Sequence, residues 1–425
     1  MFKQKNQKDG VFYGLWIVAG CFVLLFLFSG AGFYSFSIFI KPLEDYFGWS
    51  RAAISLTMSI YMIVSGLTGP LVGHLIETYG PKKVMPLFAL GAGACYILVS
   101  FTPALWFFYM AYSLLSIASS GIGFIPVSSI LARWYIRRRG TAIGFAMVGI
   151  AVGGLVMAPL VGQITLHFSW RVSFIFLGFL IWSIALPVTL FVIKGSPSEL
   201  GLMPDGDQAE QVETFGPVPG PEKVASTGGE EGWPLMAVLR TRSFLWIAAP
   251  FFLAPLAQMG VLQPQVPLIV EAGISQTTAA TAMGLTAGFG GLGKLSFGRI
   301  SELLPFHYAA MLCFGLQAFG VFILLNAQSM SVVWFYVMIF GFAMGGVIVL
   351  LPMVVSQFYG LASFGVIVGF VSLIQAVGCA SGALISGLFY DYMGGYHYAL
   401  IMYICIYLMA IITIFMAGKP KPYSY

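Results

Sequence analysis

Lys294 is the residue whose type and position in this sequence most clearly point to chemistry. It stands inside an apolar stretch, 281–304 (TAMGLTAGFGGLGKLSFGRISELL), in a chain that is 59% hydrophobic and 8% charged. Glu302 follows it by about two helical turns. An ionisable residue held at membrane depth is costly and by default marks the path of a substrate or an ion. If this stretch spans a membrane, we expect Lys294 to attract an anion. The alternative is that its side chain reaches the headgroups and anchors the helix.

Other polar side chains in apolar stretches are candidates to complete a binding site with Lys294. We predict substrate contacts from Tyr34, Tyr61, Ser119, Gln258 and Gln375. Each could equally form a hydrogen bond between helices, which is worth only about 1 kcal/mol. The stretch 258–267 (QMGVLQPQVP) adds two prolines to its amides, and broken helices are tolerated beside a cavity or in buried protein. We therefore expect an outer gate there.

The composition excludes a water-soluble globule. The 425 residues include 38 Phe, 51 Gly and 20 Met, and the mean hydropathy is +0.92. One core could not bury that much apolar surface, so the chain is predicted to be an integral membrane protein in contact with lipid. Its net charge of +5 lies in short loops, which indicates membrane orientation and not a nucleic-acid surface.

Apolar stretches of membrane-spanning length recur along the chain. They lie at roughly 12–39, 52–76, 84–101, 104–132, 140–167, 172–193, 243–270, 276–301, 307–326, 331–357, 362–389 and 396–417. The pattern predicts an all-α membrane protein with twelve transmembrane helices in two pseudosymmetric six-helix bundles. The bundles would comprise residues 1–194 and 241–425, joined by a polar cytoplasmic linker at 195–240.

The distribution of cations predicts the orientation. Of the 20 Lys and Arg residues, all but Lys41, Arg51 and Arg171 fall on one side of the apolar stretches. Cytoplasmic loops carry an excess of Lys and Arg, so both termini and the linker are expected in the cytoplasm.

The sequence offers no pattern typical of an enzyme. Five cysteines lie singly in apolar stretches without a paired spacing: Cys21, Cys95, Cys313, Cys379 and Cys405. The run GFGGLG at 288–293 lies within a predicted helix and follows no strand, so it favours helix packing over phosphate binding. We expect neither catalysis, nor a metal, nor a cofactor.

Two loops at equivalent positions share a Gly-x-x-x-acid pattern. The run GHLIETYGPKK (73–83) follows the second apolar stretch, and GRISELLPFHY (298–308) follows the eighth. The glycines would let helices approach closely, while Glu77 would cap a helix N-terminus or pair with an Arg. A solvated charged loop would explain the cations but not the repeat. We predict that conformation is controlled by Gly73, Glu77, Gly80, Lys82, Lys83, Arg137, Arg138, Gly298 and Glu302.

These motifs carry a resemblance. The loop 73–83 resembles the cytoplasmic loop between the second and third helices of the major facilitator superfamily, with Glu77 where Asp is commoner. The run WYIRRRGTAIGFAMVG (134–149) resembles the entry to the fifth helix of the monocarboxylate transporter family. The Asp-Gly pair at 9–10 and the run KPLEDYFGWSRAAIS (41–55) are weaker companions. The chain is thus similar to that family and its oxalate/formate antiporter relatives. The resemblance implies the major facilitator fold.

The resemblance also implies a role for Lys294. In that family an Arg on the eighth helix, four residues before a Gly, anchors the substrate carboxylate, and the run KLSFG places Lys294 at that distance from Gly298. Gly290 and Tyr34 stand where animal members carry an Asp and a Lys to which proton coupling is usually assigned. Proton symport therefore lacks its usual carriers. A solitary deep cation favours a monoanion over a dicarboxylate.

We therefore expect secondary transport of a lactate-, pyruvate- or formate-like monocarboxylate across a bacterial inner membrane. Transport would proceed by alternating access, as proton symport or anion exchange, in a protein that works as a monomer and binds no nucleic acid. One alternative is an exporter of amphipathic drugs or a siderophore. Another is a non-transporting membrane sensor or scaffold, which is disfavoured because the stretch 195–240 is its only sizeable soluble part.

Overall fold

The computed structural model is helical throughout the part of the chain that it describes. It describes residues 12–49, 51–206, 238, 241–262, 264–265, 268–269, 273, 276–327, 329–361, 363–393 and 395–417. Most of the predicted linker lies outside this part, at residues 207–237 and 239–240. The long helices of the first half are α1 (Gly14–Ser29), α2 (Phe36–Phe47), α3 (Arg51–Tyr79), α4 (Pro81–Ser100), α5 (Leu105–Ser120), α6 (Phe124–Trp134), α7 (Arg139–His167) and α8 (Trp170–Leu180). Those of the second half are α10 (Arg242–Leu262), α12 (Gln276–Leu303), α13 (Phe306–Leu325), α14 (Met330–Tyr359), α15 (Phe364–Met393) and α16 (His397–Met416).

Length and composition agree with the predicted membrane fold. Within the described residues, 11 helical segments are long and apolar enough to cross a membrane. The helix α12 is not among them although it has 28 residues, since its glycines, threonines and charged residues make it less apolar. It occupies the eighth position of the predicted series and packs between α7 and α14. A spanning helix surrounded by protein does not need the hydropathy of one that faces lipid.

Several spans are interrupted at points that hydropathy does not reveal. The first span runs from α1 through a π-helical turn, η1 (Gly30–Tyr34), into α2. The extra residue in this turn is accommodated by Ser35, whose backbone N–H and hydroxyl both donate to the carbonyl oxygen of Gly30, at 3.1 and 2.7 Å. The fourth span is divided into α5 and α6 around Gly121 and Gly123. Two π-helical turns, η2 (Ile181–Ala185) and η3 (Val188–Val192), extend α8 around Pro187.

Each half has its own apolar core. One cluster of buried side chains joins mainly α1 to α8, and another joins mainly α10 to α16. Large apolar side chains also cover the outer surface, among them Leu155 and Leu166, which are 77% and 80% exposed. This is expected for helices whose outer faces contact lipid and whose inner faces contact each other.

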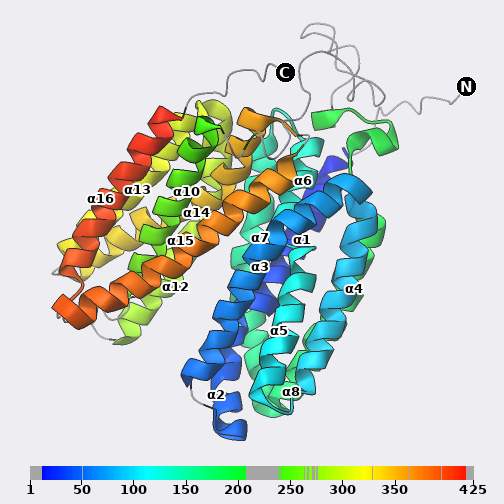
Figure 1. Ribbon diagram of the computed structural model, residues 1–425, viewed down its shortest axis with the longest axis horizontal. Coiled ribbons are helices and arrows are strands. Elements are labelled where there is room, and N and C mark those ends of the chain that lie inside the picture. The colour runs from blue at the N-terminus through cyan, green and yellow to red at the C-terminus, as the bar shows by residue number, and fades with distance from the viewer. Residues whose placement is uncertain are drawn as a thin grey trace, which may run out of the picture.

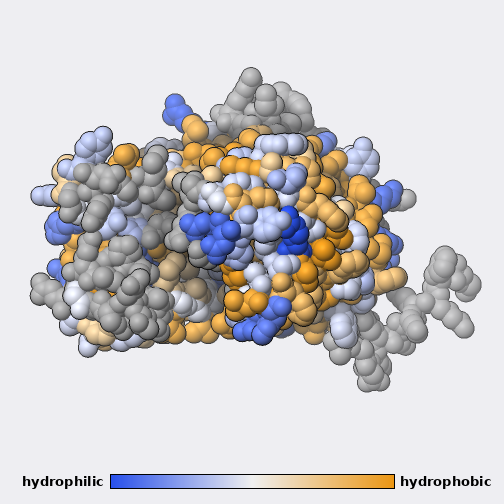
Figure 2. All heavy atoms as spheres, turned by 90° about the horizontal axis from the view of Figure 1, so that it is seen from below, coloured by the Kyte–Doolittle hydropathy of each residue, from blue (hydrophilic) through white to orange (hydrophobic). Residues whose placement is uncertain are grey.

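The two halves meet through two pairs of long helices. The helix α3 packs along α15, and α7 packs along α12 (Figure 1). The helix α1 begins, and the helix α16 ends, at the same end of the molecule (Figure 1). At the opposite end, hydrophilic side chains stand among apolar ones (Figure 2).

The seventh span changes conformation at a proline within its predicted extent. The helix α10 comprises Arg242–Leu262, Pro264 lies in a turn, and Gln265, Leu268 and Ile269 beyond it are helical. Proline cannot donate a backbone hydrogen bond and disfavours helical geometry in the preceding residue, so the proline-containing run interrupts the helix. Beyond the break, Gln265 donates from Nε2 to Thr286 Oγ1 of α12 at 3.0 Å. The broken segment is therefore tied to the eighth span.

Candidate functional site

Two contacts between the halves lie at the end of the molecule where α1 begins. We call the contact of α3 with α15 around Gly73 and Glu77 the first seam. The contact of α7 with α12 around Gly140, Gly298 and Glu302 is the second seam. Each seam combines a close approach of two helix backbones with a carboxylate at a helix N-terminus.

The first seam is closed at a pair of glycines. Gly73 of α3 faces the backbone of Gly365 of α15, and a Cβ atom at position 73 would overlap the Gly365 carbonyl group. A Cβ atom at Gly365 would in turn lie 3.1 Å from the Gly73 Cα atom. Two helices can come this close only where neither carries a side chain, which is why both residues are glycine.

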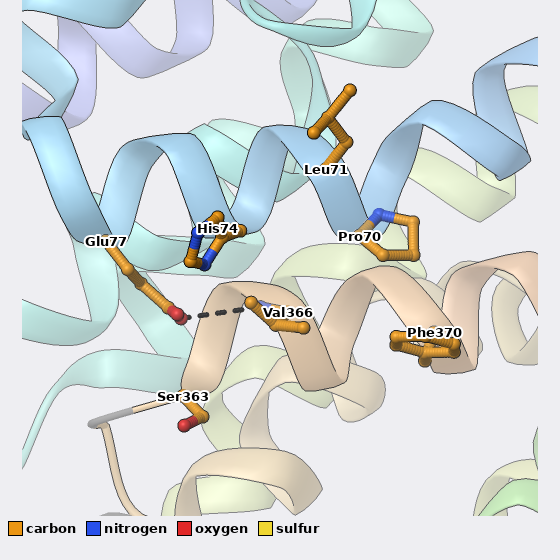
Figure 3. Close-up of a pocket in the computed structure, with 7 residues that line it drawn as sticks. All are labelled: Pro70, Leu71, His74, Glu77, Ser363, Val366 and Phe370. Atoms are coloured by element: carbon orange, nitrogen blue, oxygen red, sulfur yellow. Dashed lines mark hydrogen bonds between the residues drawn. The ribbon is translucent and has the colours of Figure 1, made fainter. Parts of the chain in front are cut away.

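Glu77 holds this seam through hydrogen bonds to the first turn of α15. Its Oε1 atom accepts from the backbone N–H of Gly365 at 2.6 Å and from that of Val366 at 3.4 Å (Figure 3). The first N–H groups of a helix lack partners within the helix, and the helix dipole is positive there. The Glu77 carboxylate, which comes from the other half, supplies an acceptor for these N–H groups and a negative charge near the positive end of the dipole. The repeat in the sequence identified Glu77, but not the helix that it caps.

The second seam repeats this arrangement with the halves exchanged. Gly140 of α7 faces the backbone of Gly298 of α12, where a Cβ atom on either residue would overlap the other's carbonyl group. Glu302 Oε1 accepts from the backbone N–H of Thr141 at 2.6 Å, and Oε2 accepts from the Thr141 hydroxyl at 2.9 Å. Arg299 also pairs with Glu302 Oε2 at 2.7 Å. Here a carboxylate of the second half caps a helix of the first.

A pocket of about 450 Å³ opens beside the first seam. Its lining residues come from α3 and from the start of α15: Pro70, Leu71, His74, Glu77, Ser363, Val366 and Phe370 (Figure 3). The imidazole of His74 is exposed, and Glu77 is partly buried with its carboxylate directed at α15 (Figure 3). The pocket belongs to the seam and does not include Lys294.

The remaining residues predicted to control conformation surround the seams. Gly80 adopts φ +80° between α3 and α4, a conformation that residues with a side chain rarely adopt. Lys82 and Lys83 are exposed in the first turn of α4. Arg137 and Arg138 are exposed in the connection before α7. These cations therefore lie at the same end of the molecule as the seams.

Lys294 lies at the crossing of α12 with both of its neighbours. Backbone atoms of Lys294 face Gly144 of α7 on one side and Gly345 of α14 on the other, and a Cβ atom at either glycine would crowd them. The residue is 9% exposed. Within the described residues, no ion pair or hydrogen bond joins its ammonium group to another side chain. Glu302, two turns further along α12, is engaged by Thr141 and Arg299.

Three predicted polar residues of the first half come together around the π-helical turn. Tyr34 ends this turn, and its ring lies against Gly154 of α7. A Cβ atom at Gly32, in the same turn, would lie 3.0 Å from the Tyr61 hydroxyl oxygen. The Tyr61 hydroxyl is buried without a hydrogen-bond partner among the described residues, and Ser119 of α5 lies near it. The sequence did not reveal this grouping because the residues are far apart along the chain.

The predicted glutamines lie in the second half. Gln258 is on α10 and Gln375 is on α15, two helices that pack together. The Oε1 atom of Gln258 is buried and has no hydrogen-bond partner among the described residues. A buried acceptor without a partner calls for an explanation, such as a water molecule or a ligand. Across the described part of the chain, no hydrogen bond links either glutamine to Lys294.

The partners of Glu77 and Glu302 could not be predicted from the sequence. Gly365 and Thr141 donate to Glu77 and Glu302, but neither residue type signals this role. Only their position in the sequence indicated such a role, because both residues follow a predicted loop and lie at the start of a long apolar stretch. Asp205 was also missed, although its Pro-Asp-Gly context is typical of a turn. Its carboxylate accepts from three consecutive backbone N–H groups.

Comparisons with known proteins agree with this architecture. The family described as Major Facilitator Superfamily matches residues 22–383. Human monocarboxylate transporter 12 is 25% identical over 94% of this chain and 79% of its own length. The uncharacterised MFS-type transporter YcxA of Bacillus subtilis (strain 168) is 25% identical, with 91% of each chain covered. The oxalate:formate antiporter of Oxalobacter formigenes is 23% identical over 84% of this chain and 81% of its own.

Solved structures agree on the fold. The proton:xylose symporter XylE superposes with a TM-score of 0.72 at 14% identity, covering 96% of this chain and 97% of that one. The human organic anion transporter MFSD10 gives a TM-score of 0.70 at 15% identity, covering 94% and 98%. Identities this low support the fold alone, while the family match covers most of the sequence. The chain therefore belongs to the major facilitator superfamily and is a secondary transporter, not an enzyme.

Proposed function

We propose that the protein carries a small monocarboxylate across the bacterial inner membrane, with Lys294 as the anchor for the carboxylate. The observation that carries this proposal is the environment of Lys294, which is 9% exposed and has no ion pair within the described residues. The names of two relatives, monocarboxylate transporter 12 and oxalate:formate antiporter, support the same substrate class.

Electrostatics favours an anionic ligand at this position. Removing an ammonium group from water is costly, and an opposite charge in the same low-dielectric surroundings offsets the cost. A lysine that only anchors the helix would extend its ammonium group to the headgroups and expose it. The burial of Lys294 favours the binding role. Because an ammonium group is a point charge, it tolerates more carboxylate orientations than the bidentate guanidinium of arginine.

The same argument limits the charge of the substrate. One cation balances one carboxylate, and Gln375 of α15 adds polarity without charge. A second carboxylate on the substrate would remain uncompensated, which is expensive away from water. Tyr34, Tyr61, Ser119 and Gln258 are proposed to supply hydrogen bonds around the anion. The unpartnered Oε1 atom of Gln258 is suited to a donor on a hydroxylated substrate such as lactate.

Transport is proposed to follow alternating access. Both seams lie at one end of the molecule, which the distribution of Lys and Arg assigns to the cytoplasm. With Glu77 of α3 capping α15 and Glu302 of α12 capping α7, this end is held closed. Opening requires both caps to break while the halves rock about the central site. The gating set Gly73, Glu77, Gly80, Lys82, Lys83, Arg137, Arg138, Gly298 and Glu302 acts in this step.

A competition experiment tests the substrate class. Purified protein in proteoliposomes should take up radiolabelled lactate, and unlabelled lactate, pyruvate or formate should reduce this uptake. Amphipathic drugs, siderophores and neutral solutes should not. Uptake that only drugs or siderophores reduce would support an exporter instead. Absence of transport with every solute would favour a sensor or scaffold.

Two imposed gradients then separate the coupling modes. Stimulation of lactate uptake by a proton gradient indicates symport. Stimulation by an unlabelled monocarboxylate preloaded inside the vesicles indicates anion exchange. The proposal itself fails if neither gradient nor preloading produces carboxylate uptake above that of protein-free vesicles.

A further inference from the structure

A short segment after the sixth span docks against the first half, at the end of the molecule where α1 begins. We call residues 194–206 the strap. It contains two 3-10 turns, η4 (Pro197–Leu200) and η5 (Pro204–Gly206). Trp134 Nε1 donates to the carbonyl oxygen of Lys194 at 2.9 Å, and Leu202 packs against the core of the first half. The strap is therefore a docked part of this bundle.

Asp205 fastens the strap to the connection between α6 and α7. Its Oδ2 atom accepts from the backbone N–H groups of Ile136 and Arg137 at 3.0 and 2.9 Å. Its Oδ1 atom accepts from that of Arg138 at 3.3 Å. Hydrogen bonds to a charged acceptor are stronger than those between neutral groups.

The backbone of Asp205 supports a specific role. Asp205 has φ 58° and ψ 1°, and it is the one non-glycine residue with positive φ in the described part of the chain. Such a conformation is unfavourable for a residue with a side chain and persists where surrounding contacts impose it. Glycine would fit this turn more easily, so the carboxylate explains why an aspartate is present.

The connection that Asp205 holds leads directly into the second seam. Arg138 immediately precedes α7, and Thr141 in its first turn is the donor that Glu302 caps. Arg139 Nε also donates to the Tyr135 carbonyl oxygen at 3.0 Å, which fixes the connection to the helix. Burial, together with the nearby Asp205 carboxylate, raises the pKa of Tyr135 to about 12, so this residue stays neutral at physiological pH.

We propose that Asp205 is a positioning residue for the second seam. By fixing residues 136–138, the strap orients the first turn of α7 so that Thr141 meets Glu302, and this favours the conformation in which the seam is closed. Asp205 of the strap thus holds residues 136–138, and Glu302 of the opposite half holds Thr141, so two carboxylates fix consecutive parts of the start of α7. The inference uses the alternating-access part of the proposed function and does not depend on the substrate.

Accessibility of the seam provides the test. Ser301 is 2% exposed, and its Oγ atom lies against Gly140 at the second seam. In protein with every native cysteine replaced by alanine, Ser301→Cys would be labelled with a charged, membrane-impermeant maleimide in inside-out vesicles. The rate would be compared among otherwise wild-type protein, Asp205→Asn, Asp205→Gly and Glu199→Gln. Glu199 is the matched control because it lies on the strap and accepts from Gly195 of the strap itself.

We expect Asp205→Asn and Asp205→Gly to raise the labelling rate at position 301 by about tenfold, since each removes charged hydrogen-bond acceptors. Glu199→Gln should leave the rate unchanged. If Asp205 served only the turn, Asp205→Gly would label like the wild type, and this result would overturn the proposal.

A second readout distinguishes seam opening from unfolding. Cys21 and Cys313 are fully buried in the cores of the first and second halves. Kept singly, each should remain unlabelled in the Asp205 variants. Labelling of these cysteines to the same extent as position 301 would mean that the whole fold had loosened, which also contradicts the proposal. Because labelling requires no substrate, failure here would leave the monocarboxylate assignment untouched.

Discussion

Carboxylates at the seams show how single residues join the two halves. Glu77 and Glu302 each accept a backbone hydrogen bond of 2.6 Å from the first turn of a helix in the opposite half. The N–H groups there would otherwise need water, and the helix dipole adds a favourable charge interaction. In the proposed transport cycle both contacts break when the seams open, so we expect them to stabilise the closed conformation over the open one.

Glu302→Gln tests this contribution. The amide retains the shape and one acceptor oxygen but loses the charge that Thr141 and Arg299 contact. We expect the labelling rate of a cysteine at position 301 to rise by about tenfold, as for loss of a charged hydrogen bond. Glu44→Gln, on α2 at the opposite end, is the control and should not change the rate. An unchanged rate in Glu302→Gln would exclude a gating role for this carboxylate.

The residue types in the seams could be predicted from sequence, but their partners could not. The repeated Gly-x-x-x-acid spacing identified Gly73, Glu77, Gly298 and Glu302. Glu77 contacts Gly365, which is 288 residues away in the sequence. Backbone N–H groups are present in every residue except proline, so no residue type marks the ones that receive a cap. Only the crossing of the helices determines them.

At the scale of elements, glycines set how closely the helices of the seams approach. A Cβ atom at Gly298 would overlap the carbonyl group of Gly140, whereas one at Gly288 of the same helix would meet nothing within 4 Å. The same substitution should therefore have different effects at the two positions. Close backbone contact, not helix propensity, is the reason for glycine at position 298.

Gly298→Ala should separate α7 from α12 and reduce transport several-fold. Gly288→Ala should preserve transport and stabilise α12 by about 1 kcal/mol, since alanine favours a helix over glycine. Initial uptake rates in proteoliposomes and thermal unfolding midpoints would measure both effects. Equal transport by the two variants would show that close packing at the second seam is not required.

The elements themselves were predicted well, with particular exceptions. Hydropathy located the spanning helices, and the all-α membrane fold is confirmed by the helices and by the family match. The π-helical turn at Gly30–Tyr34 was not predicted, whereas the turn at Pro264 falls in the stretch 258–267 where a broken helix was expected. A hydropathy window reports length and apolarity but not the hydrogen-bond register of the backbone. The grouping of Tyr34, Tyr61 and Ser119 depends on that turn, so it also could not be predicted.

The whole molecule has a pseudo-two-fold arrangement in which each half contributes one capping carboxylate. The helices α3 and α12 provide Glu77 and Glu302, and α15 and α7 receive them. The proposed domain limits, 1–194 and 241–425, place one helix that carries a capping carboxylate and one helix that is capped in each half. In the proposed alternating-access cycle both seams open together as the halves rock, which would couple the two caps through rigid-body motion.

The orientation of the molecule can be tested by labelling its two ends. Lys82 is exposed at the end that holds the seams, and Phe168, 74% exposed, follows α7 at the other end. In cysteine-free protein, Lys82→Cys should react with an impermeant maleimide only in inside-out vesicles. Phe168→Cys should react only in right-side-out vesicles. The reverse pattern would place the seams outside the cell and contradict the assignment from the Lys and Arg distribution.

The most direct test of the central claim is the binding of lactate to Lys294 variants in detergent, measured by calorimetry. Lys294→Arg should retain binding, because it keeps a cation four residues before Gly298. Lys294→Gln should reduce affinity by at least tenfold, since the carboxylate loses its only proposed cation. Arg242→Gln, which removes an exposed cation at the start of α10, is the matched control and should bind like the wild type. If Lys294→Gln bound lactate as tightly as the wild type, Lys294 would not be the carboxylate anchor.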